Sequence, residues 1–262
     1  MTLSNPDALP QERQQHILDL LRRQGRVLAS ELAASFAVSE DSIRRDLREM
    51  AGKGLCRRVY GGALLPAPQF DALPERIERH DLERTALAAH AASLLLPGQV
   101  VLLDAGATNI EIARALRGVA LTVVTNCPAV AAVLSGAQAT DLIVIGGRVD
   151  PRSGGAIGAM ALQQLQQLQA DVCIPGVCAV DPDGGFWGMN AEEVAFKQAM
   201  VQASDSTMIV AGSSKLGARG SFRIGVLEQV DQLLLGAGVA AEMQARLARV
   251  VPQLHQVPAR AA

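Results

Sequence analysis

The stretch "SEDSIRRDLREM", residues 39–50, brings Arg44, Arg45 and Arg48 within five consecutive positions. A guanidinium group donates paired hydrogen bonds to a guanine edge and binds phosphate, so arginines gathered on one helix face suit DNA binding. The same stretch carries four acids against these three arginines. The alternative interpretation is therefore an ordinary solvated helix face with i,i+4 charge pairs.

The helical repeat separates these charges from an apolar stripe. At about 100 degrees per residue the arginines fall opposite that stripe. The stripe consists of Ile43, Leu47 and Met50. Glu40 and Asp41 fall in the first turn, where the helix dipole favours carboxylates, and Asp46 lies toward the apolar side. We therefore expect the arginines to face outward, while the acids need not face DNA.

Two shorter patterns precede this helix. The segment "PQERQQHILDLLRRQ" has apolar residues at a helical period, begins with Pro10 and is followed by Gly25. The segment "SELAASF" predicts a short helix with Ser30 as its N-cap, and Ser39 is placed to cap the third helix. This order of helix, short helix, turn and helix is typical of a helix-turn-helix unit. It favours DNA binding over the solvated-face alternative.

A basic hairpin follows the third helix. The segment "KGLCRRVYGGAL" predicts a strand with Arg57 and Arg58 and a turn at its two glycines, which suits a wing lying on a phosphate backbone. Residues 1–62 hold ten Lys and Arg against eight acids, whereas the remainder holds fourteen against eighteen. The N-terminal segment is therefore the better partner for a polyanion.

Glycines and polar residues follow the apolar runs of the C-terminal part. They are Asp104, Gly106 and Thr108; Thr125 and Asn126; Gly146 and Gly147; and Ser213, Ser214 and Lys215. The carboxyl ends of parallel strands meet at one edge of a sheet, where ligands bind. The turn "DAGATN" leads into a helix and could cradle a phosphate with its backbone N–H groups.

Glu193 and Lys197 lie four residues apart on one predicted helix. The bland interpretation is a surface ion pair worth about 0.2–0.5 kcal/mol. The glycine-rich stretch "DPDGGFWGMN" leads directly into this helix and favours a place near the ligand edge. There the carboxylate could accept sugar hydroxyls and the ammonium could meet a phosphate.

Apolar runs alternate with helical patterns beyond residue 80. The predicted strands are "QVVLLDAG", "ALTVVTN", "DLIVIGG", "ADVCIPGVCAV" and "STMIVAGSS". Such alternation predicts an α/β domain with a mostly parallel sheet and helices on both faces. We expect a DNA-binding domain at 1–62, a proline-containing linker at 63–80 and an α/β domain at 81–262, which the family resemblance described below implies to be effector-sensing.

Composition bounds the class of protein. The chain has 262 residues, of which 49% are apolar and 19% charged, with a net charge of −2. No window approaches the roughly 18 apolar residues that a membrane span needs, so we expect a cytoplasmic protein. The four cysteines form no CxxC pair, and we expect reduced thiols with neither a metal site nor a cofactor.

The N-terminal sixty residues resemble the winged helix-turn-helix of the DeoR family of bacterial transcription regulators. The match includes the whole block "VSEDSIRRDL", in which Ser42 replaces the usual threonine and keeps a hydroxyl. The resemblance implies binding to double-stranded operator DNA. The residues expected to contact DNA are Ser39, Ser42, Arg44, Arg45, Arg48, Arg57 and Arg58.

The C-terminal segments also resemble the DeoR family, whose sensor domain is similar in fold to ribose phosphate isomerase and the coenzyme A transferases. The motifs are "LDAGATNIEIARAL", "LTVVTNCPAVAAVL", "VIGGRV", "EEVAFKQAM" and "SSKLG". By position, the resemblance implies contact with a phosphorylated sugar for Asp104, Gly106, Thr108, Asn126, Gly147, Glu193, Lys197 and Lys215. Asn109 and Cys127 stand where the family usually has hydroxyl residues.

These patterns predict a repressor controlled by a phosphorylated sugar or related metabolite. Two DNA-binding units on a symmetric dimer or tetramer would read repeated half-sites. Two alternatives stay open. One is a sugar-phosphate isomerase with Glu193 or Asp104 as the base, and the other is a regulator whose pocket binds no ligand.

Overall fold

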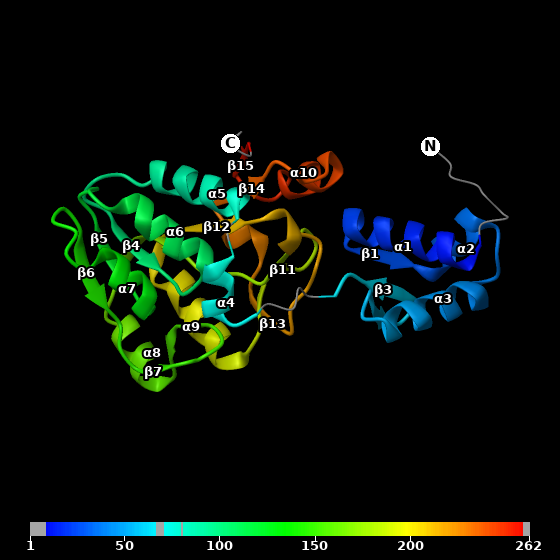
Figure 1. Cartoon of the computed structure of the whole chain (residues 1–262), viewed down its shortest axis with the longest axis horizontal. Helices are drawn as coiled ribbons and strands as arrows, with labels where there is room; N and C mark the ends of the chain where they lie inside the picture. Colours follow the sequence, from blue (N-terminus) through cyan, green and yellow to red (C-terminus); the bar gives the residue numbers. More distant parts are fainter. Residues whose placement is uncertain (1–8, 67–70, 80, 259–262) are drawn as a thin grey trace.

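The computed structural model describes residues 9–66, 71–79 and 81–258. A small N-terminal part, mostly blue in Figure 1, lies beside a larger part coloured cyan to red. The part from α1 to β3 is the N-terminal domain, and the part from α4 to β15 is the C-terminal domain.

The N-terminal domain consists of three helices and a small antiparallel sheet. Its elements are α1 (Pro10–Gln24), β1 (Arg26–Leu28), α2 (Ala29–Phe36), α3 (Glu40–Gly52), β2 (Arg57–Val59) and β3 (Gly62–Leu64). The strands pair in the order β1-β3-β2. The predicted hairpin is confirmed, and β1 adds a third strand that was not predicted. The boundary expected at residue 62 falls inside β3.

The residues at the helix ends match the predicted start, stop and capping positions, with one exception. α1 begins at Pro10 and ends at Gly25, which adopts a left-handed φ of 76°. The Ser39 side chain accepts a hydrogen bond from the Ser42 N–H, so the predicted cap of α3 is confirmed. The prediction of Ser30 as the cap of α2 is wrong, because this helix begins at Ala29. The Ala29 N–H is already bonded to the Gly61 carbonyl in the wing, 2.8 Å away.

The C-terminal domain is a larger α/β unit. Its α-helices are α4 (Leu73–Glu78), α5 (Leu82–Ser93), α6 (Ala107–Leu116), α7 (Pro128–Leu134), α8 (Ala159–Leu165), α9 (Ala191–Gln202) and α10 (Ala241–Leu247), and the short 3-10 turns are η1 (Ser213–Lys215) and η2 (Leu227–Gln229). Its strands are β4 (Val100–Leu103), β5 (Thr122–Thr125), β6 (Asp141–Val144), β7 (Arg148–Val149), β8 (Ala156–Ile157), β9 (Ala170–Ile174), β10 (Ala179–Asp181), β11 (Gly185–Gly188), β12 (Ser204–Ala211), β13 (Phe222–Gly225), β14 (Gln232–Gly236) and β15 (Gln253–Val257).

A seven-stranded parallel sheet forms the centre of this domain, in the order β15-β14-β12-β9-β4-β5-β6. Buried residues of α5, α6 and α7 pack with one face of the sheet. Buried residues of α8 and α9 pack with the other face, as Figure 1 also shows. The prediction of a parallel sheet covered on both sides is confirmed.

One predicted strand is divided in the structure. The stretch "ADVCIPGVCAV" forms β9 in the large sheet and β10 in a second sheet of order β10-β11-β13. Pro175 lacks an N–H and cannot continue the ladder, so the chain leaves the large sheet at this point. The prediction of a single strand is therefore wrong.

The strand order creates a crevice at one sheet edge. β5 and β6 follow β4 on one side, whereas β9 and β12 lie on its other side. In open parallel sheets ligands bind where the strand order reverses in this way. The carboxyl ends of β4 and β9 are therefore the expected ligand edge.

The two domains touch through a few residues near the end of α1. Gly25 packs against Gly217, so a Cβ added to either would press on the other residue's backbone. The Arg246 guanidinium donates to the Gln24 carbonyl at 3.2 Å and pairs with Asp183 at 2.8 Å. A fixed contact therefore links α1 to the C-terminal domain.

Candidate functional site

Helix α3 separates its apolar and basic faces as predicted. Ile43 and Met50 are 0% exposed and Leu47 is 2% exposed. Arg45 and Arg48 lie on the exposed side. The stripe of buried residues anchors the helix, so the opposite side is open to a partner.

The first two acids of α3 are engaged by an arginine of the same helix. The Arg44 guanidinium pairs with Glu40 at 2.7 Å and with Asp41 at 3.2 Å. These are the i,i+4 and i,i+3 pairs of the solvated-face alternative. Arg44 is therefore partly neutralised, unlike the two arginines that follow it.

The other two acids are engaged by different elements. Asp46 is buried and accepts from the Nε of Arg13 on α1 at 2.6 Å. Glu49 pairs with Lys53 at 2.7 Å, and this hydrogen bond holds the pKa of Glu49 below its ordinary value. In the described part of the chain, Arg45 and Arg48 form no ion pair. The helix thus presents two cations, although its net charge is negative.

The start of α3 and the wing complete this surface. The hydroxyls of Ser39 and Ser42 lie 3.0 Å apart at the exposed N-terminus of α3. Arg57 and Arg58 are exposed on β2. Tyr60 is fully exposed at the tip of the same hairpin and was not among the predicted DNA-contacting residues. The arrangement provides hydroxyl and guanidinium donors that match a phosphate backbone.

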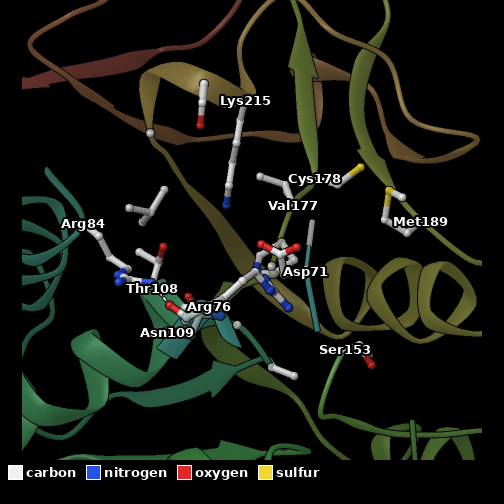
Figure 2. Close-up of a pocket in the computed structure, with 18 of the residues that line it drawn as sticks. Asp71, Arg76, Arg84, Thr108, Asn109, Ser153, Val177, Cys178, Met189 and Lys215 are labelled. Carbon is white, nitrogen blue, oxygen red and sulfur yellow. Dashed lines mark hydrogen bonds between the residues drawn. The ribbon is translucent and has the colours of Figure 1, made fainter. Parts of the chain in front are cut away.

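A cavity of about 330 Å³ lies at the crevice of the C-terminal domain. This volume is within the range of small-molecule sites. Of the predicted effector residues, those lining it are Gly106, Thr108, Glu193, Lys197 and Lys215. They come from α6, α9 and η1 and their preceding turns. Figure 2 shows Lys215 and Thr108 among the side chains drawn around this space.

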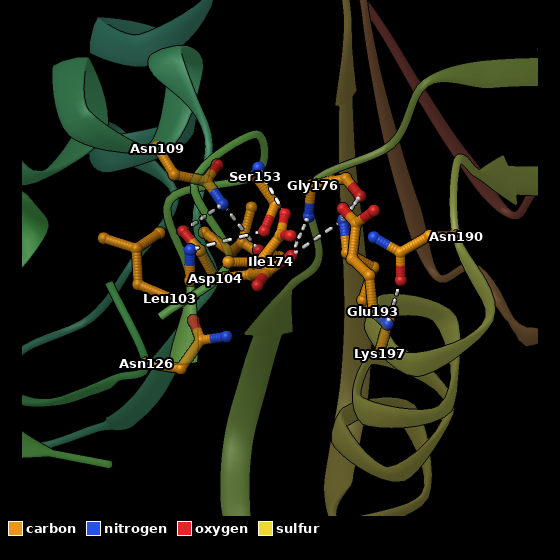
Figure 3. A network of polar contacts seen from close by, with 12 residues as sticks. Leu103, Asp104, Asn109, Asn126, Ser153, Ile174, Gly176, Asn190, Glu193 and Lys197 are labelled. Carbon is orange, nitrogen blue, oxygen red and sulfur yellow. Dashed lines mark hydrogen bonds and ion pairs between the residues drawn. The ribbon is translucent and has the colours of Figure 1, made fainter. Parts of the chain in front are cut away.

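A buried charge network forms one wall of the cavity. Lys197 is 3% exposed and pairs with Asp104 at 3.1 Å and with Glu193 at 2.6 Å, as Figure 3 shows. Burial alone lowers the pKa of Lys197, but the attraction of the two carboxylates outweighs it and raises this pKa above its ordinary value. The lysine is therefore a permanent cation that holds α9 against the end of β4.

Asp104 lies behind the cavity rather than in its lining. It is 1% exposed, and its Oδ2 also accepts the Gly176 N–H at 2.8 Å. Its carboxylate thus joins the end of β4 to the turn after β9. In this position it orients Lys197 and Gly176, which do line the cavity.

Asn109 bridges the same two strand ends. Its Nδ2 donates to the carbonyls of Asp104 and Ile174, both at 2.9 Å. The Asn109 amide therefore ties the end of β4 to the end of β9, a structural role that the sequence did not predict.

Asn126 and Gly147 do not line this cavity. Asn126 is buried and donates to the Ala156 carbonyl at 3.1 Å, while Gly147 lies before the β7-β8 hairpin. Both follow strands on the far side of β4 from β9. The four strand ends therefore do not all converge on one pocket, because the crevice opens between β4 and β9 only.

Lys215 reaches the cavity from the opposite wall. Burial, followed by the positive charges of Arg76 and Lys197, lowers the pKa of Lys215 to about 8. Its ammonium therefore lies in a cationic environment that favours an anion.

Arg76 and Arg84 also line the cavity, and sequence reasoning missed both. Arg76 belongs to α4 in the expected linker, and burial lowers its pKa. Arg84 lies in the first turn of α5 and donates to the Arg76 carbonyl at 2.7 Å. Their spacing of eight residues across a helix break gave no periodic signal.

One cysteine lies in the cavity lining. Cys178 lines the cavity, but burial raises its pKa to about 11, so it is a neutral thiol near pH 7. Within the ranges that the structure describes, no group of three His, Cys, Asp or Glu side chains could hold a metal ion. No helix in these ranges is long and apolar enough to cross a membrane.

Two family models match the chain. The DeoR-like helix-turn-helix domain matches residues 13–69, and the DeoR C-terminal sensor domain matches residues 79–236.

Curated relatives are similar over most of their length. The glycerol-3-phosphate regulon repressor of Escherichia coli strain K12 is 32% identical over 86% of this chain and 90% of its own length. The protein of the same description from Haemophilus influenzae is 33% identical, with 86% and 88% covered. The transcriptional repressor GlcR of Bacillus subtilis is 28% identical, with 86% and 87% covered.

Solved structures show more distant likeness. Ribose 5-phosphate isomerase A from Neisseria gonorrhoeae has a TM-score of 0.39 and 18% identity over 53% of this chain and 54% of its own. The eIF2B beta subunit from Chaetomium thermophilum has a TM-score of 0.45 and 14% identity, with 94% and 78% covered.

Proposed function

Because this chain belongs to the DeoR family of DNA-binding transcription regulators, we propose that it represses its target genes until a phosphorylated sugar or related metabolite occupies the cavity. The chain carries both a helix-turn-helix domain and a sensor domain. Its relatives described as repressors support repression rather than activation. The observation that carries the proposal is that α3 presents Arg45 and Arg48 while all four of its acids are paired.

In this proposal α3 lies in the major groove of operator DNA. Arg45 and Arg48 donate to base edges, and Ser39 and Ser42 at the helix start bind phosphate or base. Arg44 contributes less, because it is paired with two acids of its own helix. The wing arginines, Arg57 and Arg58, bind the backbone and carry no sequence information.

The cavity suits a small phosphorylated polyol. Its lining offers the Thr108 hydroxyl, the Asn190 amide and the Glu193 carboxylate to hydroxyl groups, and its cations to a phosphate. A relative described as a repressor of a glycerol-3-phosphate regulon is consistent with such a ligand. The buried Asp104 acts by holding Lys197 in place.

The effector signal reaches the DNA-binding domain through the segment after β12. Lys215 faces the cavity, and Gly217 two residues later packs against Gly25 at the end of α1. A ligand that draws Lys215 inward moves the surface on which α1 rests. Release of DNA requires only that the effector prefers the arrangement that does not fit the operator.

We also propose that the protein acts as a homo-oligomer, either a dimer or a tetramer. One α3 helix contacts a single half-site, and two symmetric copies double the contacts on a repeated or palindromic operator. Sedimentation equilibrium of the full chain measures the assembly, and a monomer at micromolar concentration would contradict it.

Catalysis fits the cavity less well. An isomerase needs a carboxylate base that is free to approach a substrate carbon. Asp104 is buried behind the lining, and Glu193 is paired with Lys197 at 2.6 Å. Turnover of pentose or hexose phosphates above background would favour the enzyme alternative.

The test uses full-length protein and an operator selected from a random-sequence DNA pool. Fluorescence anisotropy measures operator affinity with glycerol 3-phosphate or a phosphorylated pentose or hexose, each beside its unphosphorylated counterpart. We expect at least one phosphorylated compound to weaken operator binding about tenfold or more, a coupling of ordinary allosteric size. If none alters DNA binding or thermal stability, the pocket does not sense this class of metabolite.

A further inference from the structure

The segment expected to be a linker contains a helix that belongs to the sensor domain. Helix α4 occupies Leu73–Glu78, between the segments that match the two family models. Leu73 is 3% exposed within the main core, and its N–H is bonded to the Arg152 carbonyl at 2.9 Å. A Cβ on Gly154 would overlap the Leu73 side chain, so the fit is close. The helix is therefore anchored at the cavity rather than loosely tethered.

This anchoring places three cations around one part of the cavity. Arg76 lines the cavity from α4, Arg84 from α5 and Lys215 from η1. Figure 2 shows the three side chains directed into the same space from different walls. Arg84 also donates to the carbonyls of Arg76 and Arg79, so it holds the end of α4 in position. These hydrogen bonds fix the Arg84 side chain and the backbone of α4, which carries Arg76.

Three acids near this cluster have hydrogen-bond or ion-pair partners other than the Arg84 guanidinium. Asp71 pairs with Arg79, and Asp81 accepts the Arg84 backbone N–H at 3.0 Å. Glu83 accepts the Ser213 N–H at 3.3 Å, beside the start of η1. In the described ranges, Arg84 forms no ion pair. Burial, and then the positive charges of Arg76, Lys197 and Arg84, lower the pKa of Lys215.

We propose that Arg76, Arg84 and Lys215 form the seat for the phosphate group of the effector, so the ligand is a phosphate monoester bound jointly by α4 and the sensor domain. A phosphate dianion offers three oxygens, matching three cationic donors that come from separate elements. Its hydroxylated remainder reaches Asn190 and Glu193 on the opposite wall. The inference rests on the proposed sensing function and adds the orientation of the ligand and the part played by α4.

The experiment measures binding of inorganic phosphate to the full-length protein by isothermal titration calorimetry at constant ionic strength. The variants are Arg76→Gln, Arg84→Gln and Lys215→Met, with Arg76→Lys as a charge-retaining substitution. The control is Arg223→Gln, because Arg223 is exposed on β13 and does not line the cavity. Each protein is first checked for cooperative thermal unfolding, because Arg84 also holds α4.

We expect each charge-removing variant to weaken phosphate binding about tenfold or more, as loss of a charged hydrogen bond does. Arg76→Lys loses less than Arg76→Gln, and the control stays within about twofold of the parent protein. If phosphate binds the parent protein and the three variants equally, the seat is wrong while phosphate sensing survives. If neither phosphate nor any phosphorylated compound of the operator assay binds the parent protein, the proposed effector class itself fails.

Discussion

The contact between Gly25 and Gly217 provides a direct test of communication between the domains. In Gly25→Ala, a Cβ would lie 2.9 Å from both the Cα and the carbonyl carbon of Gly217, and closer still to its oxygen. Gly217 would have to withdraw by roughly 1 Å to restore an ordinary contact. The left-handed φ of 76° adds roughly 1–2 kcal/mol of backbone strain for alanine.

Gly54→Ala is a matched control in the same domain. Gly54 has a φ of 72°, and a Cβ there would meet nothing within 4 Å. The backbone strain is therefore common to both variants. The difference between them isolates the overlap with Gly217, which we expect to cost about 1–3 kcal/mol or to separate the domains.

Urea unfolding measures the loss of stability, and operator binding measures the response to the effector. We expect Gly25→Ala to unfold more readily than Gly54→Ala, and its operator affinity to respond less to the effector. The ratio of operator affinities without and with effector should move toward one in Gly25→Ala only. If both variants match in stability and in effector response, the Gly25–Gly217 contact does not carry the signal.

Further substitutions and a change of pH test the DNA surface, the buried ion pair of α3 and the cavity. Arg48→Ala should cost about 1–3 kcal/mol of operator affinity, measured by fluorescence anisotropy. An equal loss of affinity for random DNA would argue against a base contact by Arg48. Arg57→Ala should lower by about one the slope of the logarithm of operator affinity against the logarithm of salt concentration. Asp46→Ala leaves Arg13 without its buried carboxylate and should cost about 3 kcal/mol in urea unfolding, and an unchanged midpoint would contradict this. The pKa of Lys215 is lowered to about 8, so the free cavity loses this charge as the pH rises through that value. Affinity for a phosphorylated effector should therefore fall from about pH 7 to about pH 9, whereas Lys215→Met should show little change over this range.

Much of the local structure followed from residue order. The apolar stripe of α3 and its Ser39 cap were predictable because helical period and capping involve residues at most a few positions apart. The parallel sheet followed from alternating strands and helices, whose chirality allows few arrangements. The prediction of Ser30 as a cap was wrong because α2 begins one residue earlier, at Ala29, whose N–H is bonded to the Gly61 carbonyl of the wing, thirty-two positions away.

The candidate site was only partly predictable. Lys197 and Glu193 were identified by their spacing, but the third member of their network, Asp104, lies behind the cavity on another element. Arg76 and Arg84 were missed because the side chains that line a pocket come from separate elements, and no short-range sequence pattern shows which elements meet.

The sequence by itself determined the family and the alternation of strands and helices along the chain, and it predicted the outward arginines of α3, because these depend on contiguous motifs and on hydrophobic period. It did not determine which charged side chains pair with one another. Only the tertiary structure paired Asp46 with Arg13, brought the arginine of α4 to the cavity and set Gly25 against Gly217. Coulomb attraction and steric overlap act over a few ångströms of space, so residues far apart in the chain decide them.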